Sequence, residues 1–178
     1  LEDSLMATFT ERAVDAMMAM MTDGATGLNA VTLPTLRASL GITTAELPDI
    51  QTVEAWYHRA EQANAFPYAS VVVAGTTGER EPNSRFYTVS FDLGLVVLDQ
   101  DIAGNEVDVM VAAWRYGDAI KTIFQRRVGA GSQGWTLGTA SGIIRATVTG
   151  QQVGADPGLA VPNVALLTTI EVVTSEEY

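Results

Sequence analysis

The chemistry open to this sequence is narrow, because it holds a single histidine and no cysteine. Without cysteine it forms no disulfide, thiol nucleophile or thiolate metal site. The histidine, His58, lies close to Glu54 and Glu61, so a proton-transfer role is conceivable. One imidazole makes no cluster, and a partly solvated helix histidine is the more common interpretation of such a lone residue. We therefore predict no catalytic residue and expect the protein not to be an enzyme.

Four acidic residues gather around a predicted strand end, a pattern that in some proteins holds a divalent cation. They are Asp99, Asp101, Glu106 and Asp108. Their spacing lacks the central glycine and the distal bidentate glutamate of an EF-hand loop. Because acidic residues in a first turn stabilise a helix, Glu106 and Asp108 are explained without a metal. We expect neither a metal ion nor a cofactor.

The glycine-rich stretch Gly129–Gly134 has a superficial likeness to a phosphate-cradling loop. It follows a predicted helix instead of leading from a strand into one, and no Gly-Lys-Ser/Thr sequence is present. The Gly-x-Ser-x-Gly elbow of many hydrolases is missing as well. We interpret this stretch as a surface loop.

Length and composition indicate one globular domain, residues 1–178, with N-terminal helices over 1–64 and a sheet-and-helix core over 67–174. No apolar run approaches the roughly 20 residues that cross a bilayer, so we expect no membrane partner. The first residues lack the basic and apolar regions of a secretory signal, which gives no indication of export. The formal net charge of −11 opposes tight DNA binding, because nucleic-acid affinity comes largely from Lys and Arg.

Two helices are predicted at the start of the chain. From Leu5 to Met21 apolar residues recur at spacings of three and four, which predicts an amphipathic helix that ends at Asp23. A short helix is predicted from Pro34 to Leu40. Thr32 is its expected N-cap and Gly41 its expected terminator.

A third helix is predicted to begin near Asp49, because Pro48 and Asp49 resemble a helix start. It is expected to end before Phe66-Pro67. Its predicted buried stripe consists of Val53, Trp56, Tyr57 and Ala60.

Two strands are predicted next. The first, Tyr68–Ala74, is short and rich in β-branched residues, and the turn-forming segment Gly75–Asn83 follows it. The second, Arg85–Leu98, alternates apolar and polar residues and is the clearest strand of the sequence. Its length leads us to expect a bend or bulge at Gly94.

A long helix is predicted from Asn105 to Arg127, with Gly117 on its apolar stripe where another element could approach closely. The other stripe residues are Val107, Met110, Val111, Trp114, Ile120, Ile123 and Phe124. Strands are predicted at 142–150 and 165–174, joined by an exposed connection over 151–163. The predicted order is α-(α)-α-β-β-α-β-β, an α+β fold with a mostly antiparallel sheet of about four strands packed by helices.

The order of these elements and three local stretches resemble the tail-terminator and neck proteins of long-tailed bacteriophages, over residues 50–174. The stretches are Phe66–Val73, the strand Arg85–Leu98 with the helix Asn105–Arg127, and Leu166–Val173 with its acidic tail. The resemblance implies a virion protein, assembled in the host cytoplasm, that forms a six-fold ring at the head-tail junction. Such a ring caps the tail tube protein and docks on the connector or stopper protein, while DNA passes through its lumen without tight binding.

The resemblance also gives an expected contact surface. The segment Thr76–Asn83 would face an adjacent ring, and Met18, which falls off the first helix's core stripe, is a second candidate. The full set of expected interface residues is Met18, Thr76, Thr77, Gly78, Glu79, Arg80, Glu81, Pro82 and Asn83. Two alternatives stay open: a head-completion or stopper protein, and a small ligand-binding or enzymatic domain that uses the loops around Asp99 and Gly131.

Overall fold

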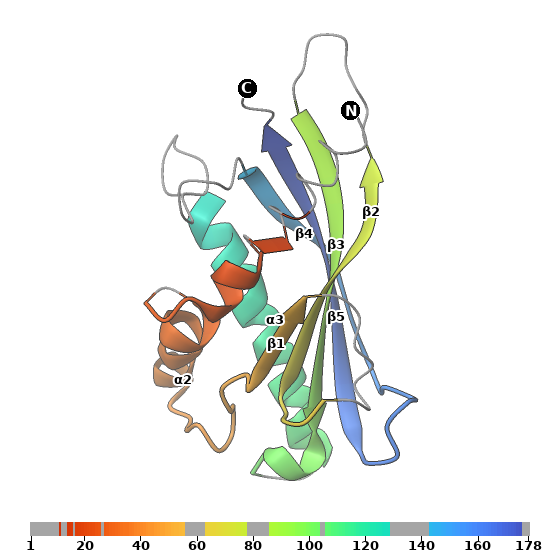
Figure 1. Ribbon diagram of the computed structural model, residues 1–178. Coiled ribbons are helices and arrows are strands. Elements are labelled where there is room, and N and C mark those ends of the chain that lie inside the picture. The colour runs from red at the N-terminus through yellow and green to blue at the C-terminus, as the bar shows by residue number, and fades with distance from the viewer. Residues whose placement is uncertain are drawn as a thin grey trace.

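A computed structural model describes residues 11, 14–15, 17–25, 27–55, 63–77, 86–103, 106–128 and 143–175. It has an α+β fold in which helices pack on one face of a twisted five-stranded sheet (Figure 1). Residues 14–15 and 17–22 are helical and belong to an N-terminal helix. The elements that follow are η1 (Leu28–Thr32), α2 (Leu33–Leu40), β1 (Thr52–Ala55), β2 (Tyr68–Thr77), β3 (Phe86–Leu98), η3 (Asp99–Asp101), α3 (Glu106–Val128), β4 (Ile143–Gly154) and β5 (Asn163–Ser175).

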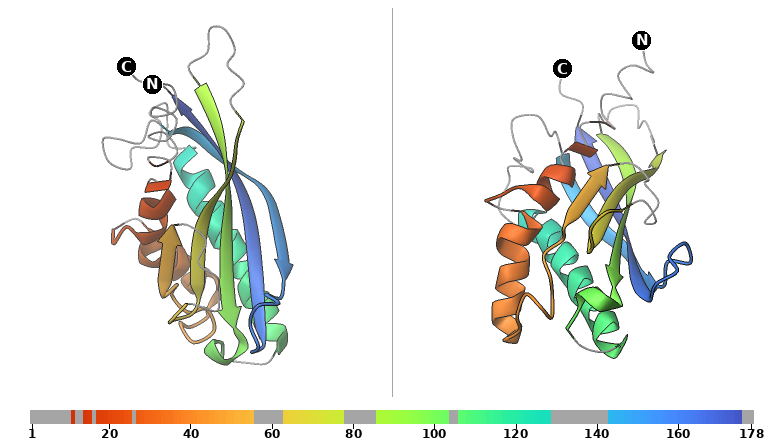
Figure 2. Two further views of the ribbon diagram at one scale, coloured as in Figure 1. Left: turned by 45° about the vertical axis from the view of Figure 1, so that its right-hand side comes forward. Right: turned by 60° about the horizontal axis from the view of Figure 1, so that its bottom comes forward.

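The strands lie in the order β1-β2-β3-β5-β4. β1 runs parallel to β2, and the other neighbouring pairs are antiparallel. β3 and β5 pair along their whole length, from Phe86↔Ser175 to Leu98↔Asn163, and form the centre of the sheet. α3 connects β3 to β4 and packs on β3, β4 and β5 (Figure 2). β1 and β4 are therefore the two edges.

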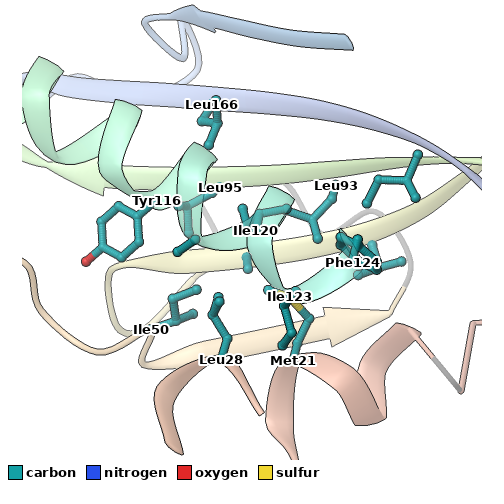
Figure 3. Close-up of a cluster of buried hydrophobic side chains, with 14 of the residues drawn as sticks. Met21, Leu28, Ile50, Leu93, Leu95, Tyr116, Ile120, Ile123, Phe124 and Leu166 are labelled. Carbon is teal, nitrogen blue, oxygen red and sulfur yellow. The ribbon is translucent and has the colours of Figure 1, made fainter. Parts of the chain in front are cut away.

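The hydrophobic core lies between α3 and the sheet face that α3 covers, which we call the inner face (Figure 3). On β3 every second side chain is buried: Val89, Phe91, Leu93, Leu95 and Val97. This alternation confirms the sequence pattern of the second predicted strand. Met21, Leu28 and Ile50 close the core on the side of the N-terminal helix and β1 (Figure 3). The opposite, outer face carries half-buried polar residues such as Ser90 and Asp92.

Side chains hold the segment between α2 and β1 against the rest of the fold. The buried Arg37 donates from Nε to the carbonyl oxygen of Leu47 at 2.7 Å, and its guanidinium pairs with Asp49. Asn29 donates from Nδ2 to the Ile50 carbonyl at 2.8 Å and accepts from the Ile50 amide at 3.0 Å. These contacts satisfy buried backbone groups and fix where β1 begins.

The predicted helix from Asp49 is wrong over its described part, because residues 52–55 form the strand β1. This strand is the fifth of the sheet, one more than expected. Hydrogen bonds to β2, together with the Gln51 amide bond to the Pro67 carbonyl at 2.9 Å, override a weak helical pattern. Residues 56–62, which hold the remainder of the expected stripe and His58, lie outside the described residues.

The long helix is confirmed as α3, but the apolar stripe expected in its first half is wrong at Trp114. The Val107 side chain lies outside the described residues, and Met110 packs against the core from its margin. Trp114 is 57% exposed, and Met110 and Val111 are only half-buried. The buried positions there are instead Val109, Ala112, Ala113 and Tyr116. Alanine has almost no side chain, so it lets the helix axis lie close to the sheet, and the largest apolar residues do not mark the buried face. In the second half, Ile120, Ile123 and Phe124 are buried as expected.

The short helix α2 confirms one of its two expected end signals. Gly41 has φ 65°, the left-handed conformation that terminates a helix, and its amide bonds to the Arg37 carbonyl. Thr32 is not a side-chain cap. It already has helical backbone angles and makes no capping hydrogen bond, because the π-helical turn η1 runs directly into α2.

Several strand boundaries differ from expectation. β2 extends to Thr77 and β4 to Gly154, so the exposed connection before β5 shortens to 155–162. The expected bulge at Gly94 is not found: the pairing of β3 is continuous there on both sides. The irregularities lie instead in β2, between Val73 and Gly75, and in β4. These strands adjust to the twist, while the central strand keeps its register.

Candidate interaction surfaces

The expected interface residues fall into three groups. Met18 is half-buried and packs against the core, so it is closer to the core than its place off the stripe suggested, and its role as a contact stays a prediction. Thr76 and Thr77 are not in a loop; they end β2 and pair with Val89 and Thr88. β2 continues through them because β3 offers pairing partners to that point. Gly78, Glu79, Arg80, Glu81, Pro82 and Asn83 lie outside the described residues.

Three of the four acidic residues considered for a cation have described side chains, and the Glu106 side chain lies outside the described part. Asp99 and Asp101 form the short turn η3 at the end of β3, and Asp108 is exposed on α3. Among the described residues, no group of three or more His, Asp or Glu side chains is arranged to hold a metal ion. Burial raises the pKa of the Asp101 carboxyl above its usual value.

Glu54, one of the two carboxylates near His58 in sequence, has a structural partner. The Tyr68 hydroxyl donates to Glu54 Oε2 at 3.1 Å, which joins β1 to β2. Glu61 and the stretch Gly129–Gly134 lie outside the described residues. His58 lies outside the described residues as well, so Glu54 is the one residue of this group that the structure describes.

Two hollows are open to the surface. One, of about 310 Å³, lies across β2, β3, β5 and β4, and Tyr68, Ser70, Gly94, Gln152 and Leu167 are among its lining residues. The other, of about 580 Å³, lies between the start of α3 and the connection before β5, and Asp99, Met110, Asp156, Leu159 and Val161 are among its lining residues. The Asp99 Oδ1 atom is buried and has no hydrogen-bond partner among the described residues.

β4 forms an open edge of the sheet. Thr147, Thr149–Gln152 and Gly154 are exposed, and no described residue pairs with the backbone of β4 on the side away from β5. Such an edge presents a row of backbone donors and acceptors to whatever approaches it. Apart from Arg145, the described strand contains none of the charged or proline residues that usually protect an edge.

α3 lies alongside this edge. Gln151 donates from Nε2 to the Gly117 carbonyl at 2.9 Å, and a Cβ on Gly117 would lie 3.2 Å from that nitrogen. This contact confirms the close approach expected at Gly117. On the same side of α3, one turn before and one turn after, lie the exposed Trp114 and Lys121. We call the β4 edge together with Trp114 and Lys121 the β4 flank.

Sequence reasoning missed the β4 flank, because a strand becomes an edge through the pairing order of the whole sheet. The exposed Trp114 gave a misleading signal, since a large aromatic residue at helical spacing usually faces a core.

Among the described residues, no helix has the length and apolarity needed to cross a bilayer. No protein-family profile matches the sequence, and no curated protein is significantly similar to it.

Proposed function

We propose that this protein is a structural virion protein of a tailed bacteriophage, a tail terminator that forms a ring at the head-tail junction. In this role the ring caps the tail tube and docks on the connector. The observation that carries the proposal is the order β2, β3, α3, β4, β5, with α3 covering a single sheet face. This order matches the succession of elements on which the resemblance to tail-terminator and neck proteins rests.

The part of the outer sheet face around Asp92 supports the same role. In rings of this kind a sheet from each subunit contributes to the lumen. On the outer face of this sheet the acidic Asp92 and Glu171 lie on the neighbouring strands β3 and β5, and Asp92 accepts a hydrogen bond from the Thr169 hydroxyl at 3.0 Å. Carboxylates at a channel wall repel phosphates, so DNA would pass without being held.

The proposal is tested by the oligomeric state and by the position of the protein in the particle. Mass photometry of the purified chain should show a hexamer, or a monomer that becomes hexameric only on tail tubes. Electron microscopy of tube ends incubated with the chain should show one ring at the end. A chain that stays monomeric and never appears at tube ends would contradict the proposal. Density one ring nearer the capsid would identify a stopper protein instead.

One observation favours a second candidate, a ligand-binding domain. A carboxylate oxygen that is buried without a partner costs free energy, and Asp99 Oδ1 is such an atom beside the hollow of about 580 Å³. A cationic or hydrogen-bond-donating ligand would offset that cost. A thermal-shift screen with Mg²⁺, Ca²⁺, polyamines and nucleotides tests this candidate. A dose-dependent rise in melting temperature that Asp99→Asn removes would favour it, and a flat screen would count against it.

A further inference from the structure

Charge is strongly segregated along this chain. The 37 residues from Ala119 to Ala155 contain no Asp or Glu, and they hold Lys121, Arg126, Arg127 and Arg145. The remainder of the chain carries all 21 acidic residues and only the other six basic ones. The acid-free stretch comprises the second half of α3 and the whole of β4, which the Gln151–Gly117 contact places side by side. In sequence this part of the chain is therefore basic, while the rest of the protein is acidic. On the β4 flank itself Lys121 is the described basic side chain, and the exposed Asp118 lies between it and Trp114 on α3.

The opposite side of the molecule has the complementary charge. The N-terminal helix, α2 and β1 lie on the side of the sheet away from β4 (Figure 2). Residues 11–55 contain two arginines, one of which, Arg37, is buried and paired with Asp49. The same residues contain six acidic side chains: Glu11, Asp15, Asp23, Glu46, Asp49 and Glu54. We call this surface the β1 flank.

We propose that the β4 flank is the docking surface for a second copy of this chain, which presents its β1 flank. Each copy then offers two different surfaces, so the contact is heterologous and can repeat around a ring. The inference rests on the proposed function, since it names the contact through which such a ring would close. At every repeat the acid-free part of one copy meets the acidic β1 flank of the next, and the sheet edge of one copy faces the opposite sheet edge of the next.

Three features favour a protein partner over a nucleic acid. Trp114 is an exposed aromatic residue on one helical face with Lys121, and tryptophan is enriched where protein interfaces gain most of their affinity. The open β4 edge offers backbone hydrogen bonds that another polypeptide can complete. Four basic residues in a chain of net charge −11 are few for phosphate binding, whose strength grows with the number of phosphates contacted.

The first test uses substitutions at exposed positions, with mass photometry over a concentration series as the readout. Trp114→Ala and Lys121→Glu should each weaken self-association by about tenfold, the effect typical of truncating or reversing a central contact. Val161→Ala is the matched control: it also removes an exposed apolar side chain, but from the connection before β5. It should leave self-association within about twofold of the unchanged protein. Circular dichroism of each variant verifies that the fold is intact.

The second test asks by cross-linking whether the β4 flank of one copy contacts the β1 flank of another. The natural chain has no cysteine, so only the introduced thiols react. Gln152→Cys places a thiol on β4 and Thr52→Cys places one on β1. With a short bismaleimide, the double variant should give a ladder of covalent oligomers, while each single variant should stay uncross-linked. Dimers from Gln152→Cys alone would show a two-fold contact between β4 edges and would overturn the head-to-tail arrangement.

The two tests separate this inference from the proposed function. A ring that forms and is insensitive to the Trp114 and Lys121 substitutions, without cross-links between the flanks, overturns the β4 contact and leaves the tail-terminator role standing. A chain that stays monomeric on its own and on tail tubes overturns both. A final experiment measures DNA binding by the chain, with fluorescence anisotropy of a labelled duplex. Binding that Lys121→Glu weakens, in a chain that does not self-associate, would assign the flank to nucleic acid and overturn the proposal.

Discussion

The hydroxyl of Tyr116 on α3 donates a hydrogen bond to the backbone carbonyl of Pro48, with 2.5 Å between the two oxygens and 68 positions between the residues in sequence. The tyrosine ring is fully buried next to Leu95 and Ile120 (Figure 3). Its hydroxyl therefore links the main helix to the segment that leads into β1. Burial also raises the pKa of this hydroxyl above its usual value, because the charged phenolate would lose its hydration.

Tyr116→Phe should destabilise the protein by about 1 kcal/mol, or somewhat more, because it leaves the Pro48 carbonyl without this donor while the ring packing is kept. Urea denaturation followed by circular dichroism measures the change in the free energy of unfolding. Trp114→Phe is the control, since it alters an exposed aromatic residue on the same helix and should be nearly neutral. Equal losses from both variants would contradict a structural role for the hydroxyl.

The raised pKa of Tyr116 predicts a loss of stability in alkali. Below the unfolded-state pKa of about 10, the hydroxyl is protonated in both states, and the contribution of Tyr116 is fully present. Above it, the unfolded chain releases the proton while the folded chain keeps it, so stability falls as pH rises. The free energy of unfolding, measured from pH 8 to 11, should therefore decline more steeply in the natural protein than in Tyr116→Phe. Parallel declines would show that Tyr116 does not carry the effect.

The alternation on β3 predicts opposite responses to one substitution at neighbouring positions. Phe91→Asp should unfold the domain, because it places an unpaired charge at a fully buried site in the core. Ser90→Asp, on the outer face, should cost no more than about 1 kcal/mol. Thermal denaturation of the two variants checks this contrast. Equal sensitivity at both positions would mean that the sheet is covered on both faces.

Gly117 and Gln151 predict a coupled pair of substitutions. Gly117→Ala gains about 1 kcal/mol of helix propensity, but its Cβ would lie 3.2 Å from Gln151 Nε2, so the amide must shift and its hydrogen bond weakens. The two effects should nearly cancel in the natural background. In Gln151→Ala, where no hydrogen bond remains to be lost, Gly117→Ala should stabilise the protein by about 1 kcal/mol. A double-mutant cycle by urea denaturation measures the difference, and simple additivity would refute the coupling.

Local signals in the sequence predicted much of the fold. The alternation of apolar and polar residues in β3 and the glycine at the end of α2 are local patterns. They determine the structure of nearby residues, so they can be recognised in a single sequence. The fold class follows from the order of such elements. β1 could not be predicted in the same way, because four residues become a strand only when β2 lies beside them. The buried face of α3 was also hidden, since small alanines lie against the sheet where the pattern pointed to Trp114.

The candidate surfaces were less predictable than the fold. Charge segregation can be read directly from the sequence, but its meaning depends on α3 and β4 lying side by side. The hydrogen bond from Gln151 to the Gly117 carbonyl shows that α3 and β4 are adjacent, although the two residues are 34 positions apart in sequence. The loop expected from Thr76 begins after Thr77, because β3 is long enough to extend β2 through these two residues.

The place of β5 in the sheet has a consequence for biosynthesis. This strand is translated after every other described element, yet it is inserted between β3 and β4. In a nascent chain that has emerged only as far as β4, β3 would lack its pairing partner on one side. β4 would have no strand to pair with, because β5 is its neighbour in the sheet. The sheet would therefore close in one late step, and ribosome-bound intermediates would be the form of this protein most exposed to misassociation and to chaperones.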